Sequence, residues 1–454
     1  MSKFIVTDRH SHYLLPPSLE DWLPENHLAR FVIEVIDQLD LSLMTSQYTG
    51  RGSKAHHPAT LLAVLIYGYA TGVFSSRALE QASYDSVAHR FIAAGTHPDH
   101  DTIATFRRRF LPEIEALFVQ VLELAQEMKL LKLGNVCLDG TKIHANASKH
   151  SALSHGHIER IEVQLRAEVQ ELLALAEAAD QSRVPEGMLL PEEIKRRQDR
   201  LAVMARAKDK IAQRANERYQ REKLVFDEKI AAREAKAEWS GKRPGGRAPQ
   251  PPEPGPNATD QINLVDEDSR IMPRGGGGFE QAYNAQAAVD AGTMLVVATG
   301  MSQACNDKEQ IQPMLATLAG QSLTAGAVET LIADSGYCSA ANIEACHKAA
   351  VTPLIAVARE QHHRGWRERF SEPAALAPEA SATQTMAHTL KSKAGRALYA
   401  LRKQTVEPVF GIIKSVMRFR QFSLRGLDKV RGEWSLVCMA WNLKRMAVLR
   451  LKMS

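Results

Sequence analysis

The chain has 454 residues and a formal net charge of +5, and this length allows two or three domains with full-sized cores. The charge is uneven: the last 66 residues carry 15 basic and 3 acidic side chains, and the first 388 carry 42 basic and 49 acidic ones. Five cysteines without a CxxC pair argue against a disulfide framework, and no apolar run is long enough to span a membrane. The composition predicts a soluble cytoplasmic protein without a membrane partner, whose basic C-terminal segment binds an anionic polymer.

Residues 1–130 are predicted to be helical. Apolar residues within 26–44 recur at the 3.6-residue spacing of one helix face, and Asp101 is expected to cap a later helix. That later helix carries three consecutive arginines, Arg107, Arg108 and Arg109. Short helices around a compact turn, followed by a basic helix, are typical of a helix-turn-helix DNA reader. A plain helical bundle with an exposed basic patch explains the pattern equally well.

Strand character begins at residues 134–145, where Asp139 stands in the middle of an apolar strand. An acid inside a strand is disfavoured unless it has a partner or a function. Residues 155–237 have an apolar seam at three- and four-residue spacing, which predicts a long antiparallel helical hairpin, and the Pro/Gly-rich segment 239–257 is typical of a linker. We therefore expect an insertion over 151–260.

Strands and helices alternate after the insertion. The pattern predicts strands at 279–290, 293–299, 329–334 and 351–357, and helices that begin near Asp307, Ser339 and Arg396. Asp334 ends the third of these strands and is followed by a glycine turn. The order predicts a mixed α/β core, formed by 131–150 and 261–454, that the helical insertion interrupts.

Three acids lie where local structure does not explain them: Asp139 within a strand, Asp334 at a strand end, and Glu407 in the basic last helix. If the first strand and the strand ending at Asp334 are parallel neighbours, the two aspartates converge at one sheet edge, and a helix packed there can supply the glutamate. Three carboxylates suit Mg²⁺ or Mn²⁺ rather than zinc. Two such ions, held close together, promote in-line displacement at phosphorus.

With these features, the chain resembles the DDE transposases of bacterial insertion sequences, whose catalytic fold is RNase H-like. The segments that carry the resemblance are Leu138–Asn146, Phe279–Asp290, Ile332–Tyr337 and Arg402–Lys414. The resemblance implies that Asp139, Asp334 and Glu407 hold two metal ions, which cut and join double-stranded DNA without a covalent enzyme intermediate. It also implies a nucleoid-associated protein whose N-terminal helical domain binds terminal inverted repeats, and which forms a homodimer on the DNA ends.

The last helix departs from the family's signature by one residue. The signature has a Tyr seven residues before the Glu, a basic residue four before it, and a Lys seven after it. Lys414 and Lys403 match, whereas Tyr399 and Arg402 each lie one residue early, so the basic side chain that holds the reactive phosphate stays undecided. The residues predicted to contact DNA from this segment are Tyr399, Arg402, Lys403, Lys414, Arg418 and Arg420.

Three alternatives remain at the level of the sequence. A DNA-binding regulator with an inactive core would lack one of the acids, but all three are present. A hydrolytic nuclease of the same fold would cut DNA but not join it. A coiled-coil scaffold explains the insertion but not the acids in the strands. The acidic run Asp266–Asp268 is interpreted as a solvated loop rather than a set of further metal ligands.

Overall fold

The computed structural model describes residues 18–48, 55–177, 189–241, 245–321, 326–357, 371–377 and 379–453. The chain divides into two compact units. Unit 1 comprises Met1–Asn146 and Ala282–Ser454, and unit 2 comprises Ala147–Gln281. Unit 1 contains a helical part and a sheet, and the three acids singled out in the sequence all belong to it.

Among its described residues, the helical part of unit 1 has a 3₁₀ turn and seven α-helices. They are η1 (Glu20–Trp22), α1 (Leu28–Ile36), α2 (Ser42–Thr45), α3 (Pro58–Thr71), α4 (Ser76–Asp85), α5 (Val87–Ile92), α6 (His100–Arg109) and α7 (Leu111–Glu127). The cap of α6 is Asp99 and not Asp101 as predicted, because the Asp99 carboxylate accepts from the Thr102 N–H at 2.8 Å. No single described helix is long and apolar enough to cross a bilayer, although α3 and α4, bent by 93°, meet the length and composition criteria together.

A mixed sheet forms the centre of unit 1. Its strands within this unit are β1 (Asn135–His144), β5 (Phe279–Asp290), β6 (Val296–Ser302), β7 (Thr330–Ala333) and β8 (Thr352–Ile355), whereas β4 (Arg270–Pro273) belongs to the residues of unit 2. The strands of unit 1 are ordered β5-β1-β7-β8, with β6 paired to β5. β1 runs antiparallel to β5 and parallel to β7, so the predicted mixed α/β class is confirmed.

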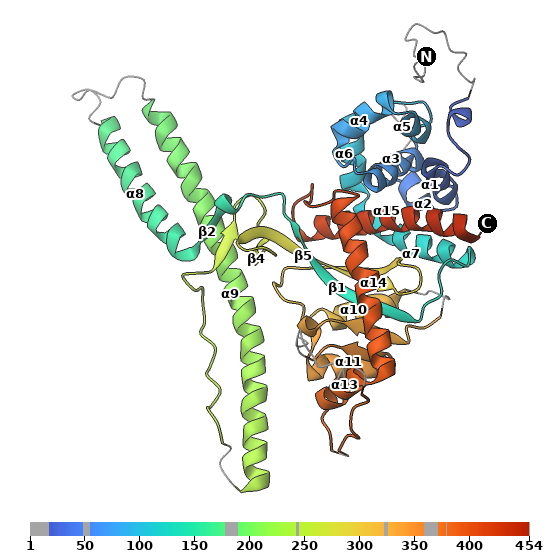
Figure 1. Ribbon diagram of the computed structural model, residues 1–454. Helices are drawn as coiled ribbons and strands as arrows, with labels where there is room; N and C mark the ends of the chain where they lie inside the picture. The colour runs from blue at the N-terminus through green and yellow to red at the C-terminus, as the bar shows by residue number, and fades with distance from the viewer. Residues whose placement is uncertain are drawn as a thin grey trace, which may run out of the picture. The chain divides into compact units, whose positions relative to one another are not determined.

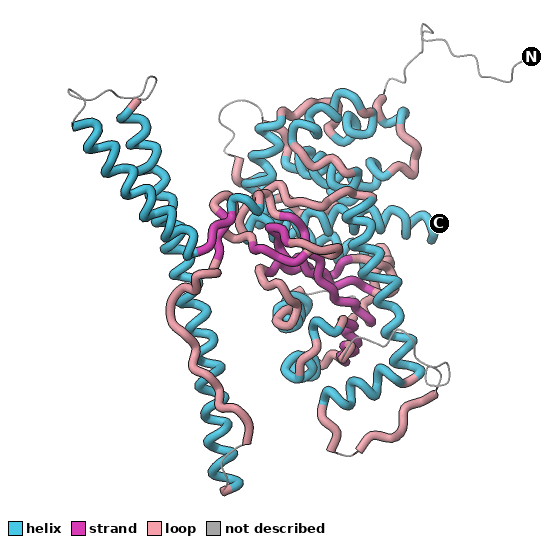
Figure 2. Tube along the Cα trace, turned by 60° about the vertical axis from the view of Figure 1, so that its left-hand side comes forward, coloured by secondary structure: helices cyan, strands magenta, loops and turns pink. Residues whose placement is uncertain are grey.

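Helices cover both faces of this sheet. α14 (Lys393–Ser415) crosses one face, and α10 (Ile311–Gly320) and α11 (Ala340–Lys348) lie on the other (Figures 1 and 2). α13 (Ala382–Lys391) precedes α14. The sequence predicted one last helix from Arg396 onward, but the chain forms two, and the second is α15 (Leu427–Met453). The break arises because Arg420 and Phe422 pair with the backbone of His144 at the end of β1.

α15 joins the sheet to the helical part of unit 1. It packs against β6 on one side and against α3 and α7 on the other. Its Trp434 is fully buried, and the indole N–H donates to the Gln286 carbonyl of β5 at 2.9 Å. Glu433, also fully buried, accepts a 2.8 Å bond from the Tyr69 hydroxyl of α3. A buried carboxylate needs such partners, so this contact ties two distant chain segments together.

Unit 2 contains two long helices, α8 (His155–Glu177) and α9 (Leu190–Ser240). Ion pairs join Glu168 to Arg197 at 2.6 Å and Glu162 to Lys208 at 3.0 Å, so the helices pack antiparallel. β3 (Gln261–Asn263) pairs with β2 (Ala152–Ser154). A small hydrophobic core packs both helices against β3, and this core comprises Ile158, Met204, Ala207, Ile211 and Ile262. The predicted turn between the helices lies outside the described residues, and the helical-hairpin insertion therefore stays a prediction.

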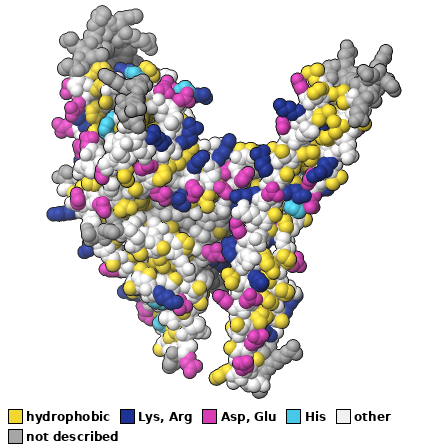
Figure 3. Space-filling model, turned by 180° about the vertical axis from the view of Figure 1, so that it is seen from behind, with side chains coloured by type: hydrophobic (Ala, Val, Ile, Leu, Met, Phe, Trp, Pro, Cys, Tyr) yellow, Lys and Arg dark blue, Asp and Glu magenta, His cyan; other side chains and the backbone are white. Residues whose placement is uncertain are grey.

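Several large hydrophobic side chains of these helices are exposed. Val163 and Leu224 are 71% and 66% exposed. Figure 3 shows such hydrophobic side chains interspersed with charged ones along this unit. The mixture gives no single-sign field on the face shown, and it is typical of a long helix that packs along only part of its length.

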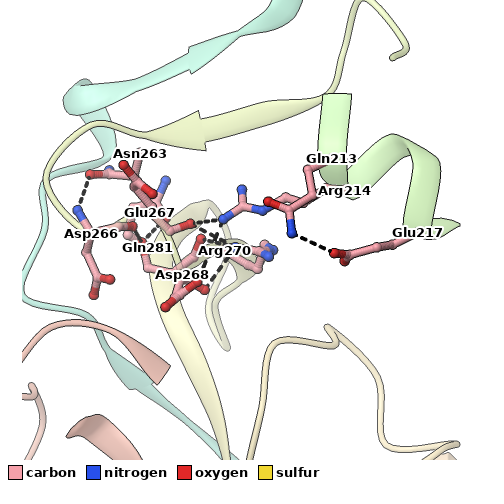
Figure 4. Close-up of polar contacts among 10 residues, drawn as sticks. Gln213, Arg214, Glu217, Asn263, Asp266, Glu267, Asp268, Arg270 and Gln281 are labelled. Carbon is pink, nitrogen blue, oxygen red and sulfur yellow. Dashed lines mark hydrogen bonds and ion pairs between the residues drawn. The ribbon is translucent and has the colours of Figure 1, made fainter. Parts of the chain in front are cut away.

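The acidic run that follows β3 is a loop that contacts α9. Figure 4 shows Arg214 of α9 pointing toward this loop. Arg214 donates to the Glu267 carbonyl and lies 3.9 Å from the Asp268 carboxylate. Asp266 is only 2% exposed, and its N–H donates to the Asn263 side chain at 3.2 Å. Asp266 is therefore buried within this loop, whereas Glu267 is exposed and the Asp268 side chain is 38% exposed.

Candidate active site

Two aspartates meet at one edge of the sheet. β1 and β7 are parallel neighbours with Leu138 opposite Ala333, so Asp139 and Asp334 each follow the last paired residue. Each carboxylate has one oxygen fixed by a following backbone N–H, at 2.9 Å for Asp139 and 2.8 Å for Asp334. The latter bond also caps η3 (Ser335–Tyr337). The strand order thus brings two carboxylates together, as expected from the sequence.

The third acid comes from α14. This helix packs against β1 and β7 through an apolar face that includes the fully buried Val406 and Val409. Glu407 lies between them in sequence, at the boundary of this face, and its side chain is 47% exposed. Pro408 within the helix removes one backbone donor but does not end it. The helix therefore presents a carboxylate beside the aspartate pair.

Arg402 links all three acids. Its guanidinium lies 3.0 Å from Asp139, 3.6 Å from Asp334 and 3.0 Å from Glu407. The arginine side chain is only 13% exposed. Burial disfavours its charge, but the surrounding acids, Asp139 foremost, outweigh burial and raise the pKa of Arg402. Three carboxylates from three separate segments thus converge on one cation.

The environment of Asp139 favours its protonated form. Burial is the largest cause, and together with the neighbouring charges of Asp334 and Asp307 it raises the pKa of Asp139 to about 6, despite the opposing effect of Arg402. A carboxylate whose pKa is perturbed by burial and by like charges at a sheet edge is typical of a functional site. The charged form of Asp139 is therefore favoured by a cation beside it.

The structure separates the two basic residues that the sequence left undecided. Arg402 points to the acids, whereas Lys403 is exposed. Tyr399, one turn before Arg402, is half-buried. The i+5 spacing from Arg402 to Glu407 does not place them on one helix face, but the long guanidinium side chain spans the difference.

The remaining basic residues of the last segment differ in exposure. The Lys414 ammonium donates to the Lys142 carbonyl at 3.0 Å, and burial lowers the pKa of Lys414. Arg420 is exposed and donates to the Lys414 carbonyl at 2.9 Å. Arg418 is also exposed and has a backbone φ of 62°. Lys414 thus faces the end of β1, and the two arginines face solvent.

Of the three arginines of α6, Arg107 does not reach the surface. It is 7% exposed and donates to the Tyr69 hydroxyl at 3.1 Å and to the Phe74 carbonyl at 2.9 Å. The prediction that Arg107 contacts DNA was wrong, because this guanidinium is needed inside to neutralise the buried network that ends at Glu433. Arg108 and Arg109 are exposed.

A fourth carboxylate beside the site was missed in the sequence. Asp307 was expected to cap a helix, but α10 begins only at Ile311, after Gln310. The Asp307 carboxylate instead accepts from the side-chain amides of Asn284 at 2.7 Å and Gln286 at 2.8 Å. The available signal in the sequence was the pair Asn284 and Gln286, two residues apart in an otherwise apolar strand. Buried amides require a hydrogen-bond partner, and Asp307 is that partner.

The residues present suit a hard divalent cation. Asp139, Asp334 and Glu407 offer oxygen donors, as Mg²⁺ and Mn²⁺ prefer, and no thiolate or imidazole is needed. Among the described residues, no three acidic, His or Cys side chains are close enough to hold one ion in this conformation. The guanidinium of Arg402 already provides positive charge to the same three carboxylates.

Two family models match the chain. Residues 253–443 match a model described as "Transposase DDE domain", and residues 17–109 match one described as "Transposase domain (DUF772)". The first match contains Asp334, Glu407 and Arg402, and the second covers the helices from α1 to α6. No curated protein and no solved structure matches the chain.

Proposed function

Because the chain belongs to the DDE transposases of the insertion-sequence type, which are enzymes of DNA transposition, we propose that Asp139, Asp334 and Glu407 are its catalytic carboxylates. One observation carries this proposal. Acids from β1, from the end of β7 and from α14 converge on the single guanidinium of Arg402. Carboxylates repel one another, and a cation among them lowers the cost of holding them close together.

The three acids would hold two Mg²⁺ or Mn²⁺ ions, with Asp139 shared and Asp334 and Glu407 each completing one site. When bound, such ions activate water or a 3′-hydroxyl and neutralise charge at phosphorus, first for hydrolysis and then for strand joining. The chain's own contribution is to fix the acids on a rigid sheet edge and one helix. The backbone N–H bonds to Asp139 and Asp334 hold one oxygen of each in place, and the other oxygen of each lies toward Arg402.

The basic residues near these acids would position double-stranded DNA. Exposed cations bind phosphates without sequence preference and give salt-dependent affinity. The set proposed to contact DNA is Tyr399, Arg402, Lys403, Lys414, Arg418, Arg420, Arg108 and Arg109. The segment 1–130 would bind the terminal inverted repeats, 131–150 with 261–454 would form an RNase H-like core, and 151–260 would be a helical insertion. A homodimer would hold two DNA ends.

The test is cleavage of DNA that carries the matching element ends, in the presence of Mg²⁺. We expect Asp139→Asn, Asp334→Asn and Glu407→Gln each to abolish cleavage while end binding is largely preserved. Asp428→Asn is the matched control, because its side chain is 88% exposed in the same basic segment, and it should cleave normally. Near-normal cleavage by any of the three variants would contradict the assignment. Cutting without joining would instead indicate a hydrolytic nuclease.

A further inference from the structure

Two amide side chains on β5 are buried where the strand passes β1. Asn284 and Gln286 are 1% and 0% exposed, and they lie opposite Lys142 and Gly140 in the antiparallel register. Burying an amide costs free energy unless its hydrogen bonds are made. Both amides donate to the same oxygen of Asp307, at 2.7 Å and 2.8 Å. A carboxylate accepts both bonds because it has acceptor sites only.

The chain of bonds continues to the turn that carries Asp334. The side-chain amide oxygen (Oε1) of Gln286 accepts from the hydroxyl of Tyr337. Tyr337 is fully buried at the end of η3, the turn capped by Asp334, and burial raises the pKa of Tyr337 so that its hydroxyl keeps the proton it donates. The donors therefore point in one direction, from Tyr337 through Gln286 to Asp307.

The groups that make these bonds also pack against β1, the strand that carries Asp139. A Cβ atom built on Gly140 would lie 2.3 Å from the Gln286 amide nitrogen and 2.6 Å from the Asp307 carboxylate. These groups therefore pack directly on the backbone next to Asp139, in space that any other residue would fill. The second Asp307 oxygen lies 3.6 Å from a Cβ built on Gly336, two residues after Asp334. Asp307 thus lies against the strand that carries Asp139 and near the turn that Asp334 caps.

We propose that Asp307 is a positioning residue of the active site, which fixes Asp139 relative to Asp334 through Gln286 and Tyr337. This inference rests on the proposed function, because it concerns the same metal-binding carboxylates. Partners in the shell around metal ligands orient them, and their removal commonly weakens metal affinity. Asp307 acts here as the terminal acceptor of the network, and its essential property is the hydrogen-bonding oxygen.

The test compares Asp307→Ala with Asp307→Asn in the full chain. Mn²⁺ binding is measured by electron paramagnetic resonance of the free ion, and the thermal midpoint is measured in parallel. We expect Asp307→Ala to weaken Mn²⁺ binding by about 10-fold, and Asp307→Asn, which keeps an acceptor oxygen, to stay within about 3-fold of the unmodified protein. Glu309→Gln, an exposed acid two residues away, is the control for the loss of one charge.

A second variant tests the other end of the network. Tyr337→Phe removes the donor and should weaken Mn²⁺ binding about as much as Asp307→Ala does. The double variant should be no worse than either single one, because both act through one chain of bonds. The proposal is overturned if Asp307→Ala binds Mn²⁺ normally, if Asp307→Asn is as weak as Asp307→Ala, or if the two effects add. Asp139→Asn distinguishes failure of this proposal from failure of the proposed function. If Asp139 is not a metal ligand, the Asp139→Asn variant will bind Mn²⁺ normally.

Discussion

At the scale of the residue, one guanidinium connects α14 to the three acids. Arg402 and Lys403 are adjacent in the chain, but only Arg402 contacts Asp139, Asp334 and Glu407. Spacing along a helix places neighbouring residues about 100° apart, so two adjacent cations cannot both face the sheet edge. Under the proposed function, Arg402 and a divalent cation would compete for the same oxygens.

We therefore expect Arg402→Gln to bind Mn²⁺ about 10-fold more tightly than the unmodified protein in the absence of DNA, because the carboxylates lose their internal counter-charge. Lys403→Gln should change the affinity little, because Lys403 is exposed. Titration of both variants with Mn²⁺ checks this. Equal or weaker binding by Arg402→Gln would show that Arg402 orients the acids rather than competing with a cation.

Arg418 carries a backbone constraint in addition to its charge. Its φ of 62° follows the end of α14, where the Phe419 N–H bonds back to the Ile413 carbonyl. Glycine is favoured at such a position, because the left-handed conformation costs other residues about 1–2 kcal/mol.

Arg418→Gly should therefore be more stable than Arg418→Ala by about 1 kcal/mol. Both variants lose the same charge and should lose the same DNA affinity. Thermal midpoints and a salt titration of DNA binding separate the two effects. Equal stability of the two variants would mean that the backbone at this position is not strained.

At the scale of the element, buried polar groups bring the helices and strands into register. α3 is apolar on nearly all sides, so its hydrophobic pattern does not specify which face meets which neighbour. The hydroxyl of Tyr69 fixes which face of α3 meets α15, because it donates a hydrogen bond to Glu433 of α15. Arg107 of α6 donates to the same hydroxyl. On the sheet, the amides of β5 have a comparable role, since only one register brings them to Asp307.

The short helix α5 adds a pH dependence to the same part of the chain. His89 is 8% exposed, and burial lowers its pKa below the ordinary value. Since the folded pKa is depressed, the neutral ring is favoured above the unfolded pKa of about 6.5, and stability is lost as the pH falls through the folded value. His89→Gln cannot protonate and should lose less of its thermal midpoint between pH 7 and 5. Parallel losses in both proteins would contradict this expectation.

At the scale of the whole molecule, the residues that flank unit 2 on either side pair with each other in the sheet of unit 1. His144 at the end of β1 is the antiparallel partner of Ala282 in β5. Paired residues of this kind have Cα atoms about 4.5–5.5 Å apart. The two ends of the insertion are therefore close enough for a short turn, and unit 1 keeps its own core without the inserted residues.

Replacing residues 147–281 by Gly-Gly should leave unit 1 folded, because a short loop can join β1 to β5 directly. We expect a cooperative thermal transition and a blue-shifted emission from the buried Trp434. An unfolded or non-cooperative product would show that unit 1 depends on the inserted residues. If the shortened protein folds, measuring its DNA cleavage shows whether the inserted residues contribute to the reaction.

The sequence by itself indicated most of the helices and strands and the places of two acids, one aspartate within the first strand and another after a parallel strand. Hydrophobic periodicity and turn chemistry suffice for this because both are local. It also indicated the family through Glu407 and its surroundings. Only the tertiary structure decided that Arg402 and not Lys403 meets the acids, that Arg107 is internal, and that Asp307 serves the amides of β5. Each of these depends on a partner from another segment of the chain, and packing, not local pattern, selects that partner.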